Sequence, residues 1–257
     1  MPELRPWARW SRAGAERPWT VGVEEEVMLL DARTRSIANR IDDVLAALPA
    51  ELAHHASAET HACVLELKTG AHATIAGVAA ELERLRPALD GVLRDELGLR
   101  AAAAGTHPLA TRSEVAITAD PRHREIAETM GALAHREPTM ALHVHVAVPD
   151  GDAAVRALDG LRDDLPLLLA LSANSPFWRG CYSGFAAMRA PIFSMFPRVG
   201  IPRRFGSYAR YAAVVDRMLS SVAIRDPSFI WWDARLRPAL GTVEVRIMDS
   251  QSRAADV

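Results

Sequence analysis

Hydrophobic and polar positions alternate in several short segments of the chain, and the first clear one is VGVEEEVMLL at residues 21–30. Apolar residues on both sides of three consecutive glutamates predict a strand packed into a domain. Side chains point alternately to the two faces of a strand, so Glu24 and Glu26 share one face and Glu25 lies on the other. One face of this strand therefore carries a pair of carboxylates.

Two interpretations of this carboxylate pair are open from the segment alone. An ionised carboxylate in a poorly solvated site is costly unless a positive charge lies beside it. A Glu-x-Glu pair on a rigid strand could hold a hard divalent cation such as Mg²⁺, which prefers oxygen ligands. A solvated edge strand with an acidic face would explain the same residues.

The rest of the pattern predicts helices and strands in mixed order. Apolar residues at three- and four-residue intervals predict an amphipathic helix over residues 73–97, which Pro87 is expected to kink. The same reasoning predicts helices at 39–48 with Asn39 as the cap, at 121–135, at 152–173 and at about 207–223, and strands at 62–70, 99–108, 140–149 and 242–247. We therefore expect one α+β domain with a largely antiparallel sheet.

The composition narrows the classes of function. At 257 residues, 49% of them hydrophobic, the chain can bury a substantial core. Its 30 lysines and arginines nearly balance 32 aspartates and glutamates, so no overall field favours nucleic acid or an anionic membrane as a partner. The longest apolar stretch, at 165–173, is far shorter than the roughly 20 residues that cross a bilayer. Small substrates are favoured, and a homo-oligomer is left open.

The cysteines and the first residues bear on the cellular compartment. Cys63 and Cys181 are too few for a disulfide framework and lack the spacing of a zinc site, which favours a reducing cytoplasm. Neither cysteine has an adjacent histidine that would activate its thiol, so both are expected to be packing residues. Residues 1–18 contain no apolar run like a signal-peptide core and are predicted to form a flexible leader.

Two later strands carry side chains that suit a metal or phosphate site. His143 and His145 share one strand face, where they could bind a metal or phosphate or be ordinary half-buried histidines. Glu244 and Arg246 also share a face. They could serve a metal and an anion, or form a surface ion pair of little energetic weight.

Four further candidates are less direct. Glu59 and Glu66 are seven residues apart, so they reach one site only if the backbone bends or bulges near residues 60–62. Arg189 and Arg198 lie in an irregular segment rich in proline, glycine and aromatic residues, and could neutralise a polyphosphate or be ordinary surface charges. The chain has no G-x-x-x-x-G-K-[ST] loop and no G-x-G-x-x-G turn, so a nucleotide would be held in another way.

Seven motifs occur in order from about Val21 to the end of the chain: VGVEEEVMLLD, ELKTG, GTHP, LHVHVAVPD, LSANSPFWRG, SGFAAMRAPIFSMFPRVGIPRRF and IWWDARLRPALGTVEVRIMD. Together they resemble the glutamate-cysteine ligase type 2 family, which includes carboxylate-amine ligases. The resemblance implies a curved, largely antiparallel sheet with helices outside, as in the catalytic domain of glutamine synthetase. Such a sheet forms a funnel for ATP, Mg²⁺ (or Mn²⁺) and an amino acid. The catalytic domain would span residues 19–257 and be incomplete at its C-terminus, because family members usually continue with more helical sequence.

The resemblance also implies roles for the candidate residues. The metal ligands would be Glu24, Glu26, Glu59, Glu66, His143 and Glu244. Nucleotide or substrate would be bound by His145, Arg189, Arg198, Asn174 and Ser175, and Arg246 and Arg198 would act in catalysis. Glu25 takes a position that is often apolar in the family, and it is the least suited of the three glutamates to bind metal. Ala141 and Ala147 stand where the family often has glycine, so each adds a Cβ where backbone could approach a ligand.

The activity implied by the resemblance is ATP-dependent ligation of an amino-acid carboxylate to an amine through an acyl phosphate. Glutamate and cysteine are the expected substrates. Two other hypotheses are kept: a non-catalytic nucleotide-binding or regulatory relative, and a metal-dependent hydrolase built on the histidines and glutamates.

Overall fold

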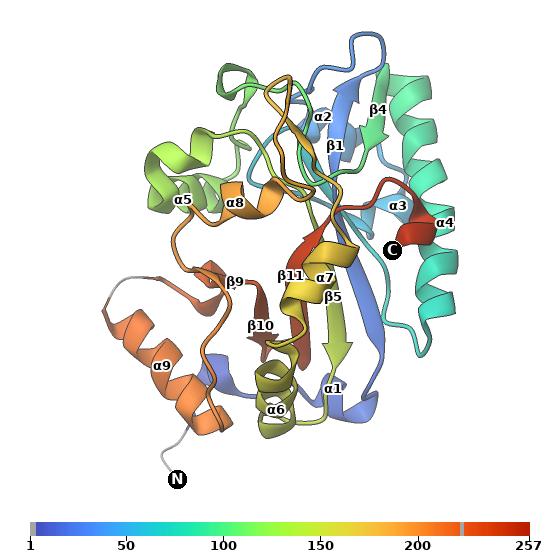
Figure 1. Ribbon diagram of the computed structural model, residues 1–257. Helices are drawn as coiled ribbons and strands as arrows, with labels where there is room; N and C mark the ends of the chain where they lie inside the picture. Colours follow the sequence, from blue (N-terminus) through green and yellow to red (C-terminus); the bar gives the residue numbers. More distant parts are fainter. Residues whose placement is uncertain (1–3, 222–223) are drawn as a thin grey trace.

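The computed structural model describes residues 4–221 and 224–257. Its centre is an antiparallel sheet in the order β10-β11-β5-β1-β3-β2, with β4 paired to the second half of β1 (Figure 1). These strands are β1 Val21–Asp31, β2 Ala56–Ala58, β3 Val64–Lys68, β4 Leu99–Ala102, β5 Ala141–Ala147, β10 Ala234–Arg237 and β11 Thr242–Asp249. Because β1 lies in the middle of the sheet, its side chains reach the centre of both faces.

Helices cover the two faces of the sheet unequally (Figure 1). One face is covered by α2 Ile41–Ala47, α3 Ala50–Ala53, α4 Ile75–Val92, α6 Gly151–Leu161 and α7 Leu165–Leu171, with α9 Tyr208–Ser220 packed beside α6. Across the other face lie α5 Pro121–Met130 and α8 Arg189–Phe193, which line a cavity there. Among residues 4–221 and 224–257, no helix combines the length and the apolar character needed to cross a membrane.

Shorter elements complete the described chain. They are α1 Arg12–Glu16, the paired strands β6 Phe177–Trp178 and β7 Cys181–Tyr182, the paired strands β8 Val199–Gly200 and β9 Trp231–Trp232, and the single turns η1 Pro6–Ala8, η2 Leu93–Leu97, η3 Arg112–Glu114, η4 Gly131–His135, η5 Pro227–Phe229 and η6 Ala254–Asp256.

The alternation predicted for β1 sorts its side chains between two environments. Val27 and Leu29 pack with leucines of α4 in a buried cluster beneath the helices. Glu25 lies on this helix-covered face too and pairs with an arginine of α4. Glu24 and Glu26 lie on the opposite face, in the cavity. The predicted division of the three glutamates is confirmed.

The fold class predicted from the sequence is confirmed, since helices pack on an antiparallel sheet. Some local predictions differ from the structure. The N-cap position of α2 is taken by Arg40 and not by Asn39. The Asn39 side chain instead bonds the backbone of Glu114 and Ala116 in a distant loop. The helix predicted at 152–173 is divided into α6 and α7, whereas the helix predicted at 73–97 is present as α4, with Pro87 inside it.

The N-terminal segment, residues 4–18, packs against the end of the sheet near α6 and α9 (Figure 1). The Trp7 indole donates a hydrogen bond to α9 at 2.9 Å, and the Trp10 indole donates one to the carbonyl of Val148 at 3.0 Å. In return, the Tyr208 hydroxyl donates to a carbonyl of this segment at 2.7 Å. Residues 4–18 thus have partners in the domain, which the prediction of a flexible leader did not include.

Candidate active site

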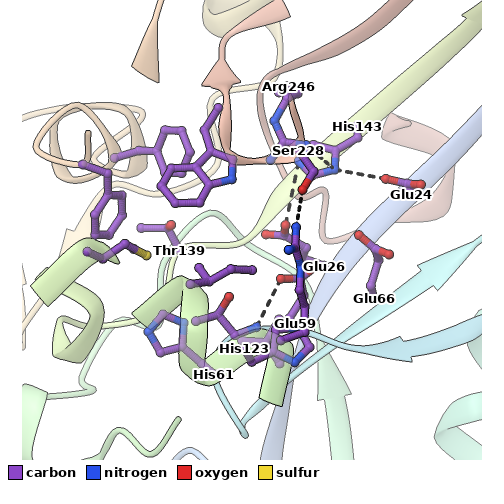
Figure 2. A pocket seen from close by; sticks show the side chains of 18 of the residues that line it. Glu24, Glu26, Glu59, His61, Glu66, His123, Thr139, His143, Ser228 and Arg246 are labelled. Carbon is purple, nitrogen blue, oxygen red and sulfur yellow. Dashed lines mark hydrogen bonds and ion pairs between the residues drawn. The ribbon is translucent and has the colours of Figure 1, made fainter. Parts of the chain in front are cut away.

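Four glutamates meet in a cavity of about 300 Å³ on the face of the sheet opposite α4 (Figure 2). Glu24 and Glu26 come from the middle of β1, and Glu66 comes from β3, whose register sets it opposite Glu26. The chain reverses between β2 and β3, where Ser57 pairs with Glu66, and this reversal brings Glu59 into the same cavity. The bend required by the seven-residue separation is therefore present as a turn of the chain.

Two histidines of β5 complete the acidic cluster. The register sets His143 opposite Glu24, and His145 lies opposite Glu244 of β11. Three sets of possible ligand atoms each lie within 4.8 Å of one another: Glu26, Glu59 and Glu66; Glu24, Glu66 and His143; and Glu24, His145 and Glu244. Carboxylate oxygens with an imidazole nitrogen suit Mg²⁺ or Mn²⁺. The structure thus brings the six predicted metal ligands into one region.

The pKa values of two cluster members reflect burial among like charges. Burial raises the pKa of Glu26 above its ordinary value, and the nearby charge of Arg189 only partly opposes this. Burial, with the charges of Glu66 and Glu26, raises the pKa of Glu59 well above its ordinary value. Ionisation of these carboxyl groups is therefore costly in the metal-free protein, and a bound divalent cation would reverse the sign of the local field.

The pKa of Glu24 shifts in the opposite direction to those of Glu26 and Glu59, because Glu24 contacts the two histidines. Burial opposes ionisation of Glu24, but its contacts with His143 and His145 outweigh burial and lower its pKa. Burial lowers the pKa of His143 to about 4, so its imidazole is neutral near pH 7 and able to bind a metal. The Nε2 atoms of both histidines are buried and have no hydrogen-bond partner within the described part of the chain. Such orphaned nitrogens beside carboxylates fit a metal site.

Glu244 is held by three arginines. Arg235 donates to its two oxygens at 2.7 and 3.1 Å, Arg237 donates at 3.2 Å, and Arg246 bonds it as well. Although burial opposes ionisation, the charges of Arg235 and Arg246 lower the pKa of Glu244 well below its ordinary value. Glu244 lies near enough to join a metal cluster, but its charge is already neutralised by guanidinium groups.

Arg246 and Arg189 give the cavity positively charged walls beside the carboxylates. A guanidinium nitrogen of Arg246 lies 3.5 Å from Nδ1 of His143. Arg189 is buried and donates to the carbonyls of Arg246 at 3.1 Å and Ile247 at 3.0 Å. Its Nε has no hydrogen-bond partner among the described residues. The cavity can therefore receive an anion next to a cation site.

A second pocket of about 300 Å³ adjoins the cavity at Glu24 and Lys68, which line both. Lys68 pairs with Glu66 at 2.7 Å, and this pairing raises the pKa of Lys68 although burial opposes its charge. Elsewhere the pocket is lined mainly by small, apolar or hydroxyl-bearing residues, among them Thr20, Gly22, Thr69, Gly70, Ala71, Ala147, Leu240 and Thr242. A charged cavity and a less polar pocket thus meet at the carboxylate cluster.

Comparisons with known proteins agree with this geometry. The model of glutamate-cysteine ligase family 2 matches residues 20–257. The chain belongs to this family. A protein of Rubrobacter xylanophilus with the provisional name glutamate-cysteine ligase 2-3 is 45% identical over 246 residues, which are 94% of this chain and 67% of the relative. A relative from Herpetosiphon aurantiacus with the provisional name glutamate-cysteine ligase 2 is 38% identical over 90% of this chain and 60% of its own length.

Solved structures share the fold of this family member. A bifunctional glutathione synthetase from Pasteurella multocida superposes with a TM-score of 0.65 at 16% identity, over 92% of this chain and 36% of the other. A glutamate-cysteine ligase from Francisella tularensis, in complex with AMP, gives a TM-score of 0.63 at 12% identity, over 90% of this chain and 61% of the other. The chain spans about 60–67% of the length of the curated relatives named above.

Three residues that the family resemblance places at the nucleotide or substrate line neither the cavity nor the second pocket, and His145 lines only the second pocket. Arg198 donates to the carbonyl of Phe229 at 2.9 Å and lies over the ring of Trp231, 4.9 Å from its centroid. The Asn174 side-chain amide donates to the carbonyl of Ser250, just after β11, at 2.9 Å, and the Ser175 hydroxyl donates to Asp249 at 2.6 Å. Their contacts support the walls, because Ser175 also accepts a bond from the backbone nitrogen of Arg189.

The two cysteines of this family member have different environments. Cys63 is buried in a small apolar cluster, and burial raises the pKa of its thiol to about 12. Its predicted packing role is confirmed. Cys181 is exposed in β7, so the prediction that it is a packing residue is wrong.

Several cavity residues were missed by reasoning from the sequence. Arg235 and Arg237 lie in β10, and the spacing in DARLRP places them on one strand face, as for Glu244 and Arg246. That alternation was a readable signal. Arg122 and His123 come from α5, while Trp231, Phe193 of α8 and Phe196 just after it supply an apolar wall. No short motif marks these residues, because only the packing of α5 and α8 across the sheet brings them together.

Proposed function

We propose that this chain is the catalytic part of an ATP-dependent carboxylate-amine ligase that joins glutamate to cysteine through an acyl phosphate. The convergence of Glu24, Glu26, Glu59, Glu66 and His143 beside buried arginines carries this proposal. Membership of glutamate-cysteine ligase family 2 supports the reaction class. A site that combines carboxylates and cations suits a reaction in which an anionic nucleotide must meet an anionic substrate.

The carboxylates and His143 would hold Mg²⁺, which shields the phosphate charges of ATP and eases attack on its γ-phosphorus. Arg246 and Arg189, which both line the cavity, would orient the attacking carboxylate, since guanidinium groups bind planar anions with defined geometry. When the amine attacks the acyl phosphate, the same guanidinium charges would stabilise negative charge on the carbonyl oxygen and the departing phosphate.

The second pocket would receive the nucleoside half of ATP. It adjoins the cluster at Glu24, so a polyphosphate bound by the cluster can continue into it. Glycine, alanine and leucine offer an apolar surface to the base, while Thr20, Thr69 and Thr242 offer hydroxyl groups to the ribose. The Francisella tularensis ligase of similar fold was solved in complex with AMP, which agrees with a nucleotide site in this architecture.

A scan of amino acids and amines for ADP release, with the mass of each product, tests the proposal. Amine-dependent ADP and a new amide from glutamate and cysteine are the expected result. Mg-ATP binding without ADP or amide would favour the non-catalytic nucleotide-binding relative instead. Substrate hydrolysis without ATP would favour a metal-dependent hydrolase.

A further inference from the structure

The N-terminal segment lies outside the family match but forms part of the second pocket. The family match begins at residue 20, whereas Ala13 and Arg17 of the preceding segment line the pocket beside Gly22 and Thr242. The side chain of Arg17 is exposed and has no ion-pair or hydrogen-bond partner among the described residues. A free guanidinium at the mouth of a pocket is available to a ligand.

The position of this segment is fixed by close backbone packing. A Cβ added at Gly14 would lie 2.6 Å from the carbonyl oxygen of Val148 and would also meet the carbonyl of Gly241. The backbone nitrogen of Ser11 donates to the carbonyl of Pro238 at 2.8 Å. Glycine is thus required where α1 crosses the β5–α6 and β10–β11 connections, because any side chain would push the helix away.

Bonds on both sides of Gly14 hold the segment in register with the sheet. The Trp10 indole donates to the same Val148 carbonyl at 3.0 Å, and the backbone nitrogen of Trp19 donates to Ala147 at 2.8 Å. The Thr20 hydroxyl donates to the carbonyl of Arg17 at 3.0 Å. Arg17 is therefore held at the pocket by contacts before and after it in the sequence.

We infer that the N-terminal segment is a wall of the nucleotide site and that Arg17 packs against the purine base of a bound nucleotide. This inference rests on the proposed function, because it takes the second pocket as the nucleoside site. A guanidinium favours the π-face of an aromatic ring. Arg17 lines the second pocket but not the charged cavity, and it precedes β1, whereas Glu24, further along that strand, lines both.

Calorimetric titration of the full chain with Mg-ATP and with Mg-tripolyphosphate tests the inference. The Arg17→Ala variant should bind Mg-ATP about fivefold more weakly, the loss expected for one exposed cation-π contact, and bind tripolyphosphate unchanged. Arg12→Ala is the matched control, because Arg12 is an exposed arginine of the same N-terminal segment that does not line the pocket. It should bind both ligands like the parent.

A second pair of variants tests the wall itself. Gly14→Val should displace the segment and weaken Mg-ATP binding more than Arg17→Ala does. Ala15→Val, at an exposed neighbouring position, should leave Mg-ATP binding unchanged. Equal Mg-ATP affinity in the parent and Arg17→Ala would overturn the inference and leave the proposed function intact. Equal losses of ATP and tripolyphosphate would overturn the contact with the base. A parent that binds no Mg-ATP would overturn the proposed function and the inference together.

Discussion

Glu25 and Glu26 are neighbours in β1, yet the two faces of the sheet treat their charges in opposite ways. Glu25 is completely buried beneath α4, where Arg86 donates to it at 2.8 Å and bonds its second oxygen as well. Glu26 is 9% exposed and accepts a hydrogen bond from the backbone of Ala141 at 2.7 Å. Within the described part of the chain it has no lysine or arginine at ion-pair distance.

This difference separates a carboxylate that supports the fold from one that is suited to a ligand. On the helix-covered face the protein supplies the compensating cation, so the charge is satisfied within the chain. On the cavity face three other glutamates crowd the site, and the pKa of Glu26 is raised. The missing positive charge would come from a bound cation, which is the physical case for a metal site here.

The largest effect on stability is expected from breaking the Glu25 pair. Glu25→Gln leaves Arg86 largely buried without its counter-charge, and loss of one partner of a buried pair costs about 3 to 5 kcal/mol of unfolding free energy. Urea unfolding measures this loss. Glu83→Gln, on an exposed turn of the same helix, is the control and should be nearly silent. A silent Glu25→Gln would show that the helix-covered face does not depend on the pair.

His61, which also lines the cavity, tests whether this face disfavours protonation of a buried imidazole. Burial lowers its pKa to about 4, so the unfolded chain binds more protons than the folded chain between about pH 4 and its ordinary value of 6.5. The stability contributed by neutral His61 is therefore present above pH 6.5 and is lost as the pH falls toward 4, by up to about 3 kcal/mol. His61→Gln should flatten this part of the profile. Parallel profiles of unfolding free energy against pH for the parent and His61→Gln would contradict the lowered pKa of His61.

A smaller effect of opposite sign is expected at Glu26. Its folded pKa is raised, so the protonated form stabilises the protein at low pH, and this stability is lost as the pH rises through the folded pKa. In metal-free buffer at pH 8, the free energy of unfolding of Glu26→Gln should therefore be about 1 kcal/mol higher than that of the parent. The gain should vanish at pH 4. A destabilised Glu26→Gln at pH 8 would mean that its charge is compensated within the chain.

The cysteines should give the smallest effects. Cys63→Ala leaves a small space in a buried cluster and should cost about 1 kcal/mol, whereas exposed Cys181→Ala should stay within about 0.5 kcal/mol. Neither change should alter turnover by more than a small factor, because the proposed reaction uses no enzyme thiol. A trapped thioester, or turnover lost with folding intact, would reopen covalent catalysis.

Local alternation made part of this molecule predictable from its sequence. The period of two correctly divided Glu24, Glu25 and Glu26 of β1 between the two faces of the sheet, and it correctly placed His143 and His145 of β5 on one face, where both lie 3.4 Å from Glu24. That signal is local, so it needs no knowledge of the fold. It was available in β10 as well, where it was overlooked.

The remaining features depend on contacts between distant parts of the chain. Arg86 lies 61 residues from Glu25, and no spacing rule connects them. Arg198 was placed at the nucleotide, but its side chain is bound by the carbonyl of Phe229 and the ring of Trp231. The N-terminal segment is rich in charge and proline, yet its tryptophans bind partners more than 100 residues away. Such pairings are set by the tertiary fold.

The central claim is that the carboxylates on the cavity face bind a divalent cation. Thermal unfolding of the parent, Glu26→Gln and the exposed-site control Glu51→Gln, each with increasing Mg²⁺, tests it most directly. A cation that binds only the folded protein stabilises it by about 2.7 kcal/mol at 100 times its Kd. We predict that Mg²⁺ raises the Tm of the parent and of Glu51→Gln, and leaves that of Glu26→Gln almost unchanged. An equal rise in all three proteins, or no rise in the parent, would contradict the claim.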